Sequence, residues 1–529
     1  MDEGRNSSLV KRAFSIAVMA LVAGSLNQPG LAEEVRQPYG FTSSEMARGA
    51  ISCEQLTALR APDLRIRRAT QIRPDPTWTI PHPRKVDPAA EIETAFCRVE
   101  ATVEDEIDFE LWLPLREDWN GRMLGTGNGG FAGFLRYDGL AHGVQRGFAT
   151  LSTNTGHLIE EQNWSIGHPR RLENYGHRGQ HLSAVNARIL IDAFYGSAPQ
   201  YSYFMGCSGG GMQAMNEVQR YPSDYDGVIA GAHGYSIAGI SARWLESALI
   251  GRDWPGTALS QDDWGIIARA GVAQCDSDDG VRDGIIGNPR SCTFRIADTP
   301  GLSPEKIETA ERILGPVTGE NGRVLFEGFL PGAEFTAIGE RGRPGEFFGE
   351  WYYRDPDWDA SLFDAARDVP LVENAIPGAE FSTPHIGAFA RRDGKLISYQ
   401  GWNDGIVPGE ATIAYYEGVR DYLGQETTDS FYRLFLAPGV DHCAGGVGAD
   451  TFGQTFLAPS PEPATPQNDI LLAMMRWVEE GVAPEQLEAS KVEDGEVAFS
   501  RPLCMFPAYP VYKGTGDPDL AENFTCETG

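Results

Sequence analysis

The chain has 529 residues, of which 74 are acidic and 44 basic, so its formal net charge is −30 and its pI about 4.7. A surface this negative repels phosphate groups, which argues against a nucleic-acid-binding protein. The 41% share of hydrophobic residues, which includes 11 Trp, is sufficient for the packed core of an enzyme-sized protein.

The N-terminal segment has the pattern of a secretory signal peptide. Basic residues at Arg5, Lys11 and Arg12 precede an apolar run at 13–24, and small residues lead up to Ala32. The alternative is a membrane anchor, but this run is shorter than the roughly 20 apolar residues that span a bilayer. We therefore expect cleavage near Ala32, a secreted or periplasmic protein, and no membrane span in the mature chain.

Predicted strands and helices alternate through two parts of the chain. Strands are predicted at 109–115, 122–127, 148–156, 201–206, 227–232, 395–400 and 430–439. Helices are predicted at 181–196, 210–220, 410–423 and 468–481. This alternation predicts a mostly parallel sheet that is covered by helices on both faces.

A long segment rich in glycine, proline and aromatic residues interrupts the alternation. We interpret it as a lid that is inserted between the two halves of one sheet. The predicted organisation is a signal peptide at 1–32, a first core part at 33–233, the lid at 234–393 and a second core part at 394–529.

Residues 206–210, with the sequence Gly-Cys-Ser-Gly-Gly, match the G-x-S-x-G pattern. They lie where a predicted strand meets a predicted helix, and in an α/β-hydrolase this turn lifts the serine hydroxyl out of the sheet. We therefore predict an α/β-hydrolase fold with Ser208 as the nucleophile. The alternative is an incidental glycine turn, since the chain has 62 glycines.

In this fold the acid and the base of the triad follow the nucleophile in that order, each in a loop after a later strand. Asp404 follows the predicted strand 395–400, and His442 follows the predicted strand 430–439. Asp404 can also be a turn-forming residue and His442 a surface loop residue. Asp441 is a rival acid, but it adjoins His442 in the chain and is poorly placed to reach its Nδ1 atom.

Two cysteines flank the predicted catalytic residues. Cys207 precedes Ser208, and Cys443 follows His442. If the serine and the histidine meet, the two cysteine Cα atoms also lie close, within the roughly 4.4 to 6.8 Å that a disulfide requires. The bond would tie the nucleophile turn to the histidine loop.

The remaining cysteines bring the total to an even number of eight, which favours four disulfides in an exported chain. Zinc is the alternative, but the sequence has no C-x-x-C pair and no histidine at zinc-finger spacing.

An oxyanion hole needs two backbone N–H donors. Gly209, directly after the nucleophile, supplies the first, and we expect Gly130 in the glycine-rich turn 127–130 to supply the second. The turn can also be a plain tight turn.

An aspartate-rich loop follows Cys275 and precedes Cys292. Calcium takes six to eight oxygen ligands, and the loop supplies both carboxylate and backbone oxygens. The predicted ligands of a structural calcium ion are the side chains of Asp276, Asp279 and Asp283 and the backbone oxygens of Val281 and Ile285. The alternative is a solvated acidic loop.

Two further motifs have less specific interpretations. His177 and His181 are four residues apart but lack the glutamate of a zinc protease, so we expect them to pack at a helix start. The aromatic cluster 351–353 is either lid core or the wall of an aromatic pocket.

With the motifs at 206–210, Asp404 and 442–443, the chain resembles the tannase and feruloyl esterase family. That family includes the hydrolase of mono(2-hydroxyethyl) terephthalate. The resemblance covers nearly the whole mature chain, including the turn 127–130 and the loop 275–292.

This resemblance implies a triad of Ser208, Asp404 and His442 and a calcium ion in the aspartate loop. It implies four disulfides, which are Cys207–Cys443, Cys53–Cys97, Cys275–Cys292 and Cys504–Cys526. Relatives often have a larger residue after the nucleophile, where this chain has Gly209.

We therefore expect a secreted serine esterase that acts on small aromatic esters of the feruloyl, galloyl or terephthaloyl type. A terephthalate half-ester requires a cation at the far end of the pocket, for which Arg243 and Arg354 are candidates by position only. The alternative from another class is a non-catalytic, calcium-stabilised binding protein. The oligomeric state cannot be read from the sequence.

Overall fold

The computed structural model describes residues 51–74, 92–253, 258–333, 345–375, 378, 381, 383–456 and 461–528. The predicted signal peptide at 1–32 lies outside these residues. In the described parts of the chain, no helix is both long and apolar enough to cross a bilayer.

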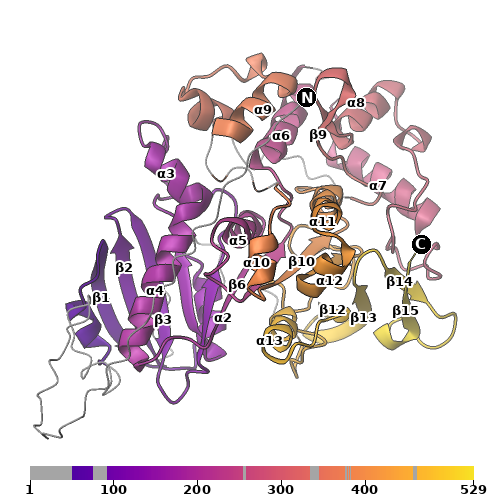
Figure 1. Cartoon of the computed structure of the whole chain (residues 1–529). Helices are drawn as coiled ribbons and strands as arrows, with labels where there is room; N and C mark the ends of the chain where they lie inside the picture. The colour runs from indigo at the N-terminus through magenta and orange to yellow at the C-terminus, as the bar shows by residue number, and fades with distance from the viewer. Residues whose placement is uncertain are drawn as a thin grey trace, which may run out of the picture.

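A nine-stranded sheet forms the centre of the molecule (Figure 1). Its strands, in spatial order, are β1 (Leu64–Ile72), β2 (Phe96–Val103), β3 (Ile107–Pro114), β5 (Ala149–Thr153), β4 (Arg122–Thr126), β6 (Tyr201–Cys207), β7 (Gly227–Gly231), β10 (Lys395–Gly401) and β11 (Tyr432–Ala437). The pairs from β1 to β5 are antiparallel, and the pairs from β5 to β11 are parallel. The mostly parallel sheet predicted from the sequence is confirmed.

Helices cover both faces of the sheet, which explains why β7, β10 and β11 are buried along their whole length. Side chains of α4 (Gly179–Tyr195), α5 (Gly209–Arg220) and α11 (Gly409–Leu423) belong to one core cluster. Those of α13 (Ile470–Glu480) belong to a second cluster, and those of α2 (Tyr137–Gln145) to a third. Helix α4 ends where the sequence predicts, at Gly196, whose φ of 77° suits glycine.

A long insertion separates β7 from β10, and most of it lies at one end of the sheet (Figure 1). Its named elements are α6 (Ile237–Asp253), α7 (Gln261–Cys275), α8 (Pro304–Leu314), β8 (Val317–Thr318), β9 (Val324–Phe326), the π-helix η6 (Phe347–Tyr353), α9 (Ala365–Ala375) and α10 (Gly387–Arg391). Helix α6 packs against both α8 and α9. The exact bounds of the lid, 234–393, stay a prediction.

The other elements flank the sheet. They are α3 (Pro169–Glu173), α12 (Gln425–Phe431), β12 (Gln486–Glu493), β13 (Glu496–Cys504), β14 (Tyr509–Tyr512) and β15 (Phe524–Glu527). The last four strands form two antiparallel pairs that the sequence did not predict.

Candidate active site

Ser208 lies at a sharp turn between β6 and α5. Its φ of 62° and ψ of −124° are strained for a residue with a side chain, as expected for a nucleophile turn. Small residues are required around it, since a Cβ atom on Gly206 or Gly210 would lie 2.5 Å from a backbone oxygen. The local sequence therefore fixes both the turn and the partial exposure of Ser208.

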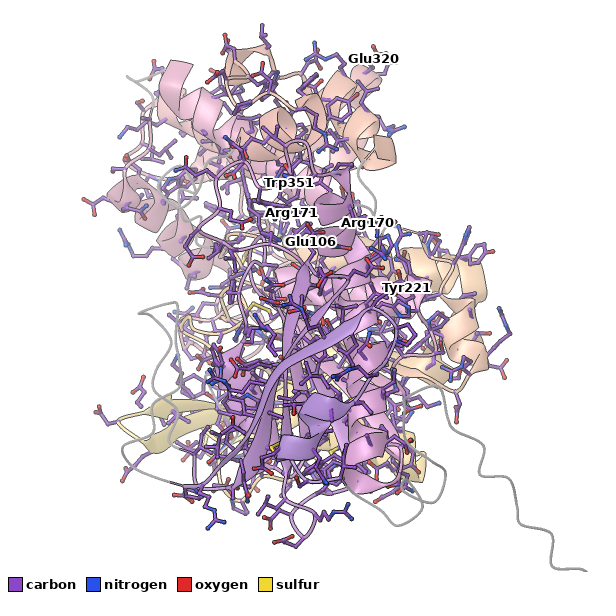
Figure 2. All side chains as sticks on the ribbon, turned by 90° about the vertical axis from the view of Figure 1, so that its left-hand side faces the viewer. Glu106, Arg170, Arg171, Tyr221, Glu320 and Trp351 are labelled. Carbon is purple, nitrogen blue, oxygen red and sulfur yellow. A yellow bond between two sulfur atoms is a disulfide. The ribbon has the colours of Figure 1, made fainter. Side chains whose placement is uncertain are left out.

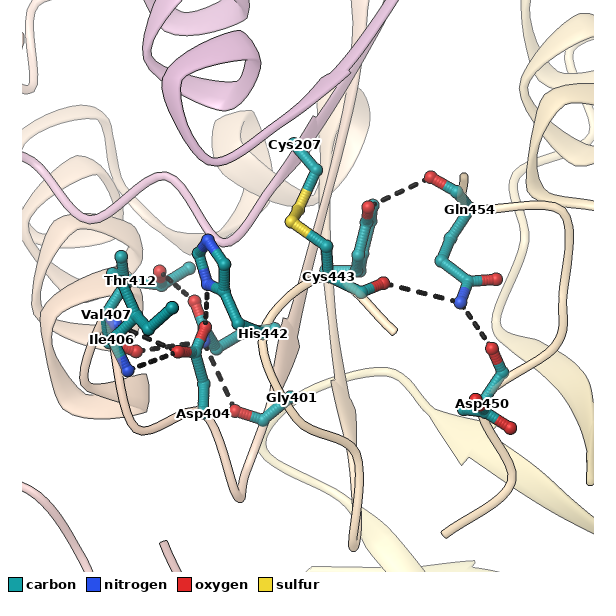
Figure 3. Close-up of a disulfide and its surroundings, with 12 residues drawn as sticks. Cys207, Gly401, Asp404, Ile406, Val407, Thr412, His442, Cys443, Asp450 and Gln454 are labelled. Carbon is teal, nitrogen blue, oxygen red and sulfur yellow. Dashed lines mark hydrogen bonds and ion pairs between the residues drawn. A yellow bond between two sulfur atoms is a disulfide. The ribbon is translucent and has the colours of Figure 1, made fainter. Parts of the chain in front are cut away.

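Asp404 and His442 lie in the loops after β10 and β11, and their side chains meet (Figure 3). The His442 Nδ1 atom is 2.8 Å from Asp404 Oδ2. Because a carboxylate only accepts hydrogen bonds, this contact places the imidazole proton on Nδ1 and leaves Nε2 as an acceptor. Asp404, rather than the rival Asp441, is the acid that holds the imidazole.

The Asp404 carboxylate is held from all sides, and its side chain is fully buried. The backbone N–H groups of Ile406 and Val407 donate to Oδ1, at 2.8 and 2.9 Å. The Gln400 side chain donates to Oδ2 at 2.9 Å and accepts from Thr412. Sequence analysis did not single out Gln400, which no motif marks.

Four disulfides join the eight cysteines, and no cysteine is free. The predicted bond between Cys207 and Cys443 is present, with the Cα atoms 6.0 Å apart across 236 positions of sequence. It joins the neighbour of Ser208 to the neighbour of His442 (Figure 3). The other predicted pairs, Cys53–Cys97, Cys275–Cys292 and Cys504–Cys526, are also confirmed.

Among the hydrogen bonds of the described residues, none joins Ser208 Oγ to His442. Such bonds are often long in a free enzyme and tighten when substrate binds. The disulfide limits how far the two side chains can separate, because it closes the loops that carry them.

The two predicted oxyanion glycines lie against each other. A Cβ atom on Gly209 would collide with the carbonyl oxygen of Gly130, and the φ of Gly130 is 54°. Gly209 begins α5, and the first N–H groups of a helix have no partner within the helix. Only glycine fits this close approach of the two backbones.

A cavity of about 390 Å³ opens onto Ser208. Ser208, Gly209 and Gly130 lie in its wall together with aromatic side chains from five parts of the chain. These aromatic residues are Phe131, Trp164, Trp244, Phe347 and Phe381. A concave, mostly apolar cavity of this size suits a small ligand with an aromatic ring.

The aromatic cluster of the lid is core rather than pocket wall. Trp351 is 1% exposed and packs edge-to-face against Phe131, Trp164 and Tyr175. In Figure 2, Trp351 is labelled where the insertion meets the central sheet. This contact anchors the lid on the residues that form the cavity.

The two arginines named as candidates for an anion site point elsewhere. Arg243 is buried, and its guanidinium donates to the backbone oxygens of Ile313, Gly315 and Glu327. Arg354 donates to the backbone oxygen of Ser165 at 3.1 Å. Neither lies in the cavity wall.

His177 and His181 pack near the start of α4, as predicted. His177 Nδ1 is 2.6 Å from the Tyr221 hydroxyl, and His181 Nδ1 is 2.5 Å from Asp224 Oδ2. The His181 ring also stacks on Tyr221, with ring centroids 3.8 Å apart.

The aspartate loop contains the three carboxylates predicted as calcium ligands, those of Asp276, Asp279 and Asp283. Asp279 is buried, and burial raises its pKa to about 6. The nearby charges of Asp283 and Asp276 also raise this pKa, whereas a hydrogen bond from the Val281 N–H lowers it. Asp283 accepts from Arg501 at 2.6 Å. Among the described residues, no three acidic, histidine or cysteine side chains are grouped to hold a metal.

The sequence profile described as Tannase and feruloyl esterase matches residues 92–309 and 363–527. The chain belongs to the tannase and feruloyl esterase family. It is therefore a carboxylic ester hydrolase, and the alternative of a non-catalytic binding protein is set aside. The resemblance stated from the sequence is confirmed, as is the α/β-hydrolase fold.

Members of this family cover most of the chain. Probable feruloyl esterase B-1 of Aspergillus flavus is 35% identical over 450 residues, which are 80% of this chain and 84% of the relative. The crystal structure of feruloyl esterase B from Aspergillus oryzae covers 90% of this chain and 99% of its own, with a TM-score of 0.83 and 27% identity. Tannin acyl hydrolase from Aspergillus niger, at 21% identity, covers 92% of this chain and 94% of its own; its TM-score of 0.71 shows the shared fold.

Proposed function

We propose that the chain hydrolyses small esters of aromatic acids through a catalytic triad of Ser208, His442 and Asp404. The disulfide between Cys207 and Cys443 is the observation that carries this proposal. It joins the neighbours of the nucleophile and the base beside a cavity that suits an aromatic acyl group.

The reaction has two steps that share one proton carrier. In the first, Ser208 Oγ attacks the ester carbonyl, His442 Nε2 takes the hydroxyl proton, and the alcohol leaves with that proton. In the second, His442 takes a proton from water, which attacks the acyl-enzyme, and the proton returns to Ser208 as the acid leaves. Asp404 stabilises the imidazolium that forms in both steps.

The tetrahedral intermediate of each step carries a negative oxygen. We assign its two donors to the backbone N–H groups of Gly209 and Gly130, since these residues lie in contact in the cavity wall. A backbone donor does not depend on the side chain, so glycine at 209 retains it.

A terephthalate half-ester is the second candidate substrate, and the cavity disfavours it. Its far end carries a carboxylate, whereas the described cavity wall contains no Lys or Arg. The wall does contain Glu160, Glu161 and Glu346. Arg171 pairs with Glu161 at 2.6 Å and neutralises its charge. We therefore favour acyl groups that bear hydroxyl rather than carboxylate substituents.

Product analysis on a panel of esters tests this assignment. Methyl ferulate, methyl gallate and mono(2-hydroxyethyl) terephthalate carry the three candidate acyl groups. We expect ferulate or gallate to exceed the terephthalate half-ester in kcat/KM by at least about tenfold. A preference for the half-ester would contradict the assignment, and no turnover of any of them would overturn the proposed function.

The disulfide beside the triad is expected to act on catalysis more than on folding. The double variant Cys207→Ala with Cys443→Ala frees the histidine loop, and a misplacement of about 1 Å can cost about 100-fold in rate. We expect kcat to fall by about this factor at temperatures where circular dichroism shows folded protein.

A remote disulfide provides the matched control. Cys504→Ala with Cys526→Ala removes the bond between β13 and β15, and we expect it to lower Tm while leaving kcat within about twofold. Equal effects of the two double variants on kcat would contradict a role of the first bond in catalysis.

We also propose that the aspartate loop binds a structural calcium ion through Asp276, Asp279 and Asp283, with backbone oxygens of Val281 and Ile285. A cation would stabilise the buried charge of Asp279. Removal of calcium by a chelator is expected to lower Tm by several degrees, and added calcium to restore it. An identical Tm with and without calcium would contradict the site.

Export is proposed from the cysteines and the N-terminal pattern together. A chain in which all eight cysteines are paired fits an oxidising compartment. N-terminal sequencing of the exported protein is expected to begin at residue 33. Retention of the first 32 residues would contradict the signal peptide.

A further inference from the structure

Three side chains of the cavity wall carry a buried polar atom without a partner among the described residues. These atoms are His157 Nδ1, Ser241 Oγ and Trp244 Nε1. Buried polar groups are almost always hydrogen-bonded, because leaving one unpaired is unfavourable. When such atoms gather in the wall of a substrate cavity, a polar group of the substrate is their natural partner.

His157 is fixed in position by its surroundings. It follows β5, is 3% exposed and stacks on Trp164, with ring centroids 3.8 Å apart. Its edge meets Tyr175, at a centroid distance of 6.1 Å. Packing on two sides leaves the imidazole little freedom to rotate.

The hydrogen bond of the other ring nitrogen sets the role of Nδ1. His157 Nε2 lies 3.0 Å from the backbone oxygen of Phe131. A carbonyl oxygen only accepts, so Nε2 carries the proton and Nδ1 presents a lone pair. Burial lowers the pKa of His157 to about 4, which keeps the ring neutral near pH 7. His157 Nδ1 therefore accepts a hydrogen bond and cannot donate one.

Trp244 and Ser241 add two polar groups to the same cavity wall. They are three residues apart on α6 and so lie on one face of that helix. The Trp244 ring lies 6.5 Å from the ring of Phe131, the residue whose backbone holds His157. An indole N–H only donates, whereas a serine hydroxyl both donates and accepts.

A hydroxyl on an aromatic ring can pair with both an acceptor and a donor of the cavity wall. Its proton pairs with an acceptor, and its oxygen or that of an adjacent substituent pairs with a donor. A carboxylate has no proton to offer at neutral pH. Carboxylate recognition is thus a poor fit to this part of the wall.

We propose that His157 Nδ1 accepts a hydrogen bond from a phenolic hydroxyl of the substrate's acyl ring, with Trp244 Nε1 donating to an oxygen on the same ring. This inference rests on the proposed function, and in it His157 recognises the substituent at the far end of the acyl group. His157 is a specificity-determining residue and does not take part in proton transfer at the ester.

A matched pair of substrates tests this role. Methyl p-coumarate and methyl cinnamate differ by one phenolic hydroxyl. His157→Phe keeps an aromatic ring for stacking on Trp164 and removes the acceptor. We expect it to lower kcat/KM for p-coumarate at least about tenfold more than that for cinnamate, mainly through KM.

The outcomes separate this inference from the proposed function. If His157→Phe lowers kcat/KM for both esters by the same factor, His157 is structural and the inference is overturned. If the wild-type enzyme hydrolyses neither ester, the proposed function itself fails.

A second measurement uses only the wild-type enzyme, so a folding defect of a variant cannot affect its result. Wild-type enzyme is compared on methyl p-coumarate and methyl 4-methoxycinnamate, in which a methyl group replaces the phenolic proton. We expect at least about tenfold higher kcat/KM for p-coumarate, because only this ester donates to Nδ1. Equal values would overturn the inference, since a water molecule would then satisfy Nδ1 whichever substrate is bound.

Discussion

Replacing Ser208 by alanine is expected to lower kcat for an aromatic methyl ester by about 10⁴- to 10⁶-fold. The change removes the only oxygen that can form the acyl-enzyme in our account. The residual rate would come from the oxyanion donors and from substrate binding. The measurement is turnover at saturating substrate, with enzyme free of wild-type contamination.

The folded structure should tolerate this substitution. Alanine is no larger than serine, and the φ of 62° at this position costs both residues a similar strain energy. We expect KM and Tm to change little, which distinguishes loss of chemistry from loss of fold. A Ser208→Ala enzyme that keeps more than about 1% of wild-type kcat would contradict the assignment.

The second large effect is expected for Asp404→Asn, with a fall in kcat of about 10⁴-fold. An amide cannot accept through both of its terminal atoms. Asp404 accepts from His442, from Gln400 and from two backbone N–H groups, so an amide nitrogen would face donors. The imidazole would lose its orientation and the charge that stabilises its protonated form.

The rival acid provides the matched control. Asp441→Asn alters the carboxylate next to His442 in the chain, and we expect kcat to change by less than about tenfold. Steady-state kinetics of both variants, with Tm as a measure of folding, decides between the two acids. A larger loss for Asp441→Asn than for Asp404→Asn would reverse the assignment.

The sequence predicted the central sheet because its parallel strands are short apolar runs between glycine turns. It did not predict β1 or β2. In β1, Arg65, Arg67 and Arg68 interrupt the apolar pattern, and most of the strand is exposed. Nor did the sequence predict the C-terminal hairpins at 486–527, whose pairing depends on contacts with the rest of the protein. Exposed strands have a weak hydrophobic pattern, because charged side chains can remain solvated at the edge of a sheet.

The candidate triad could be proposed from the sequence because its residues follow the strands in the order known for this fold. The cysteines next to Ser208 and His442 supplied a second, independent constraint. No sequence motif marks the residues of the cavity beside Ser208. Its wall combines Phe131, His157 and Trp244 from distant parts of the chain, and each of these residues is an ordinary core residue by sequence. Only the fold shows which of them retain an unpaired polar atom.

Covalent labelling with a fluorophosphonate tests most directly whether Ser208 and His442 form one reactive centre. The probe reacts with a serine only when a base activates it. We expect one label per chain, located on Ser208 by peptide mass spectrometry, and a strongly reduced rate of labelling in His442→Ala. Labelling at another residue, or at the same rate without the histidine, would contradict the account.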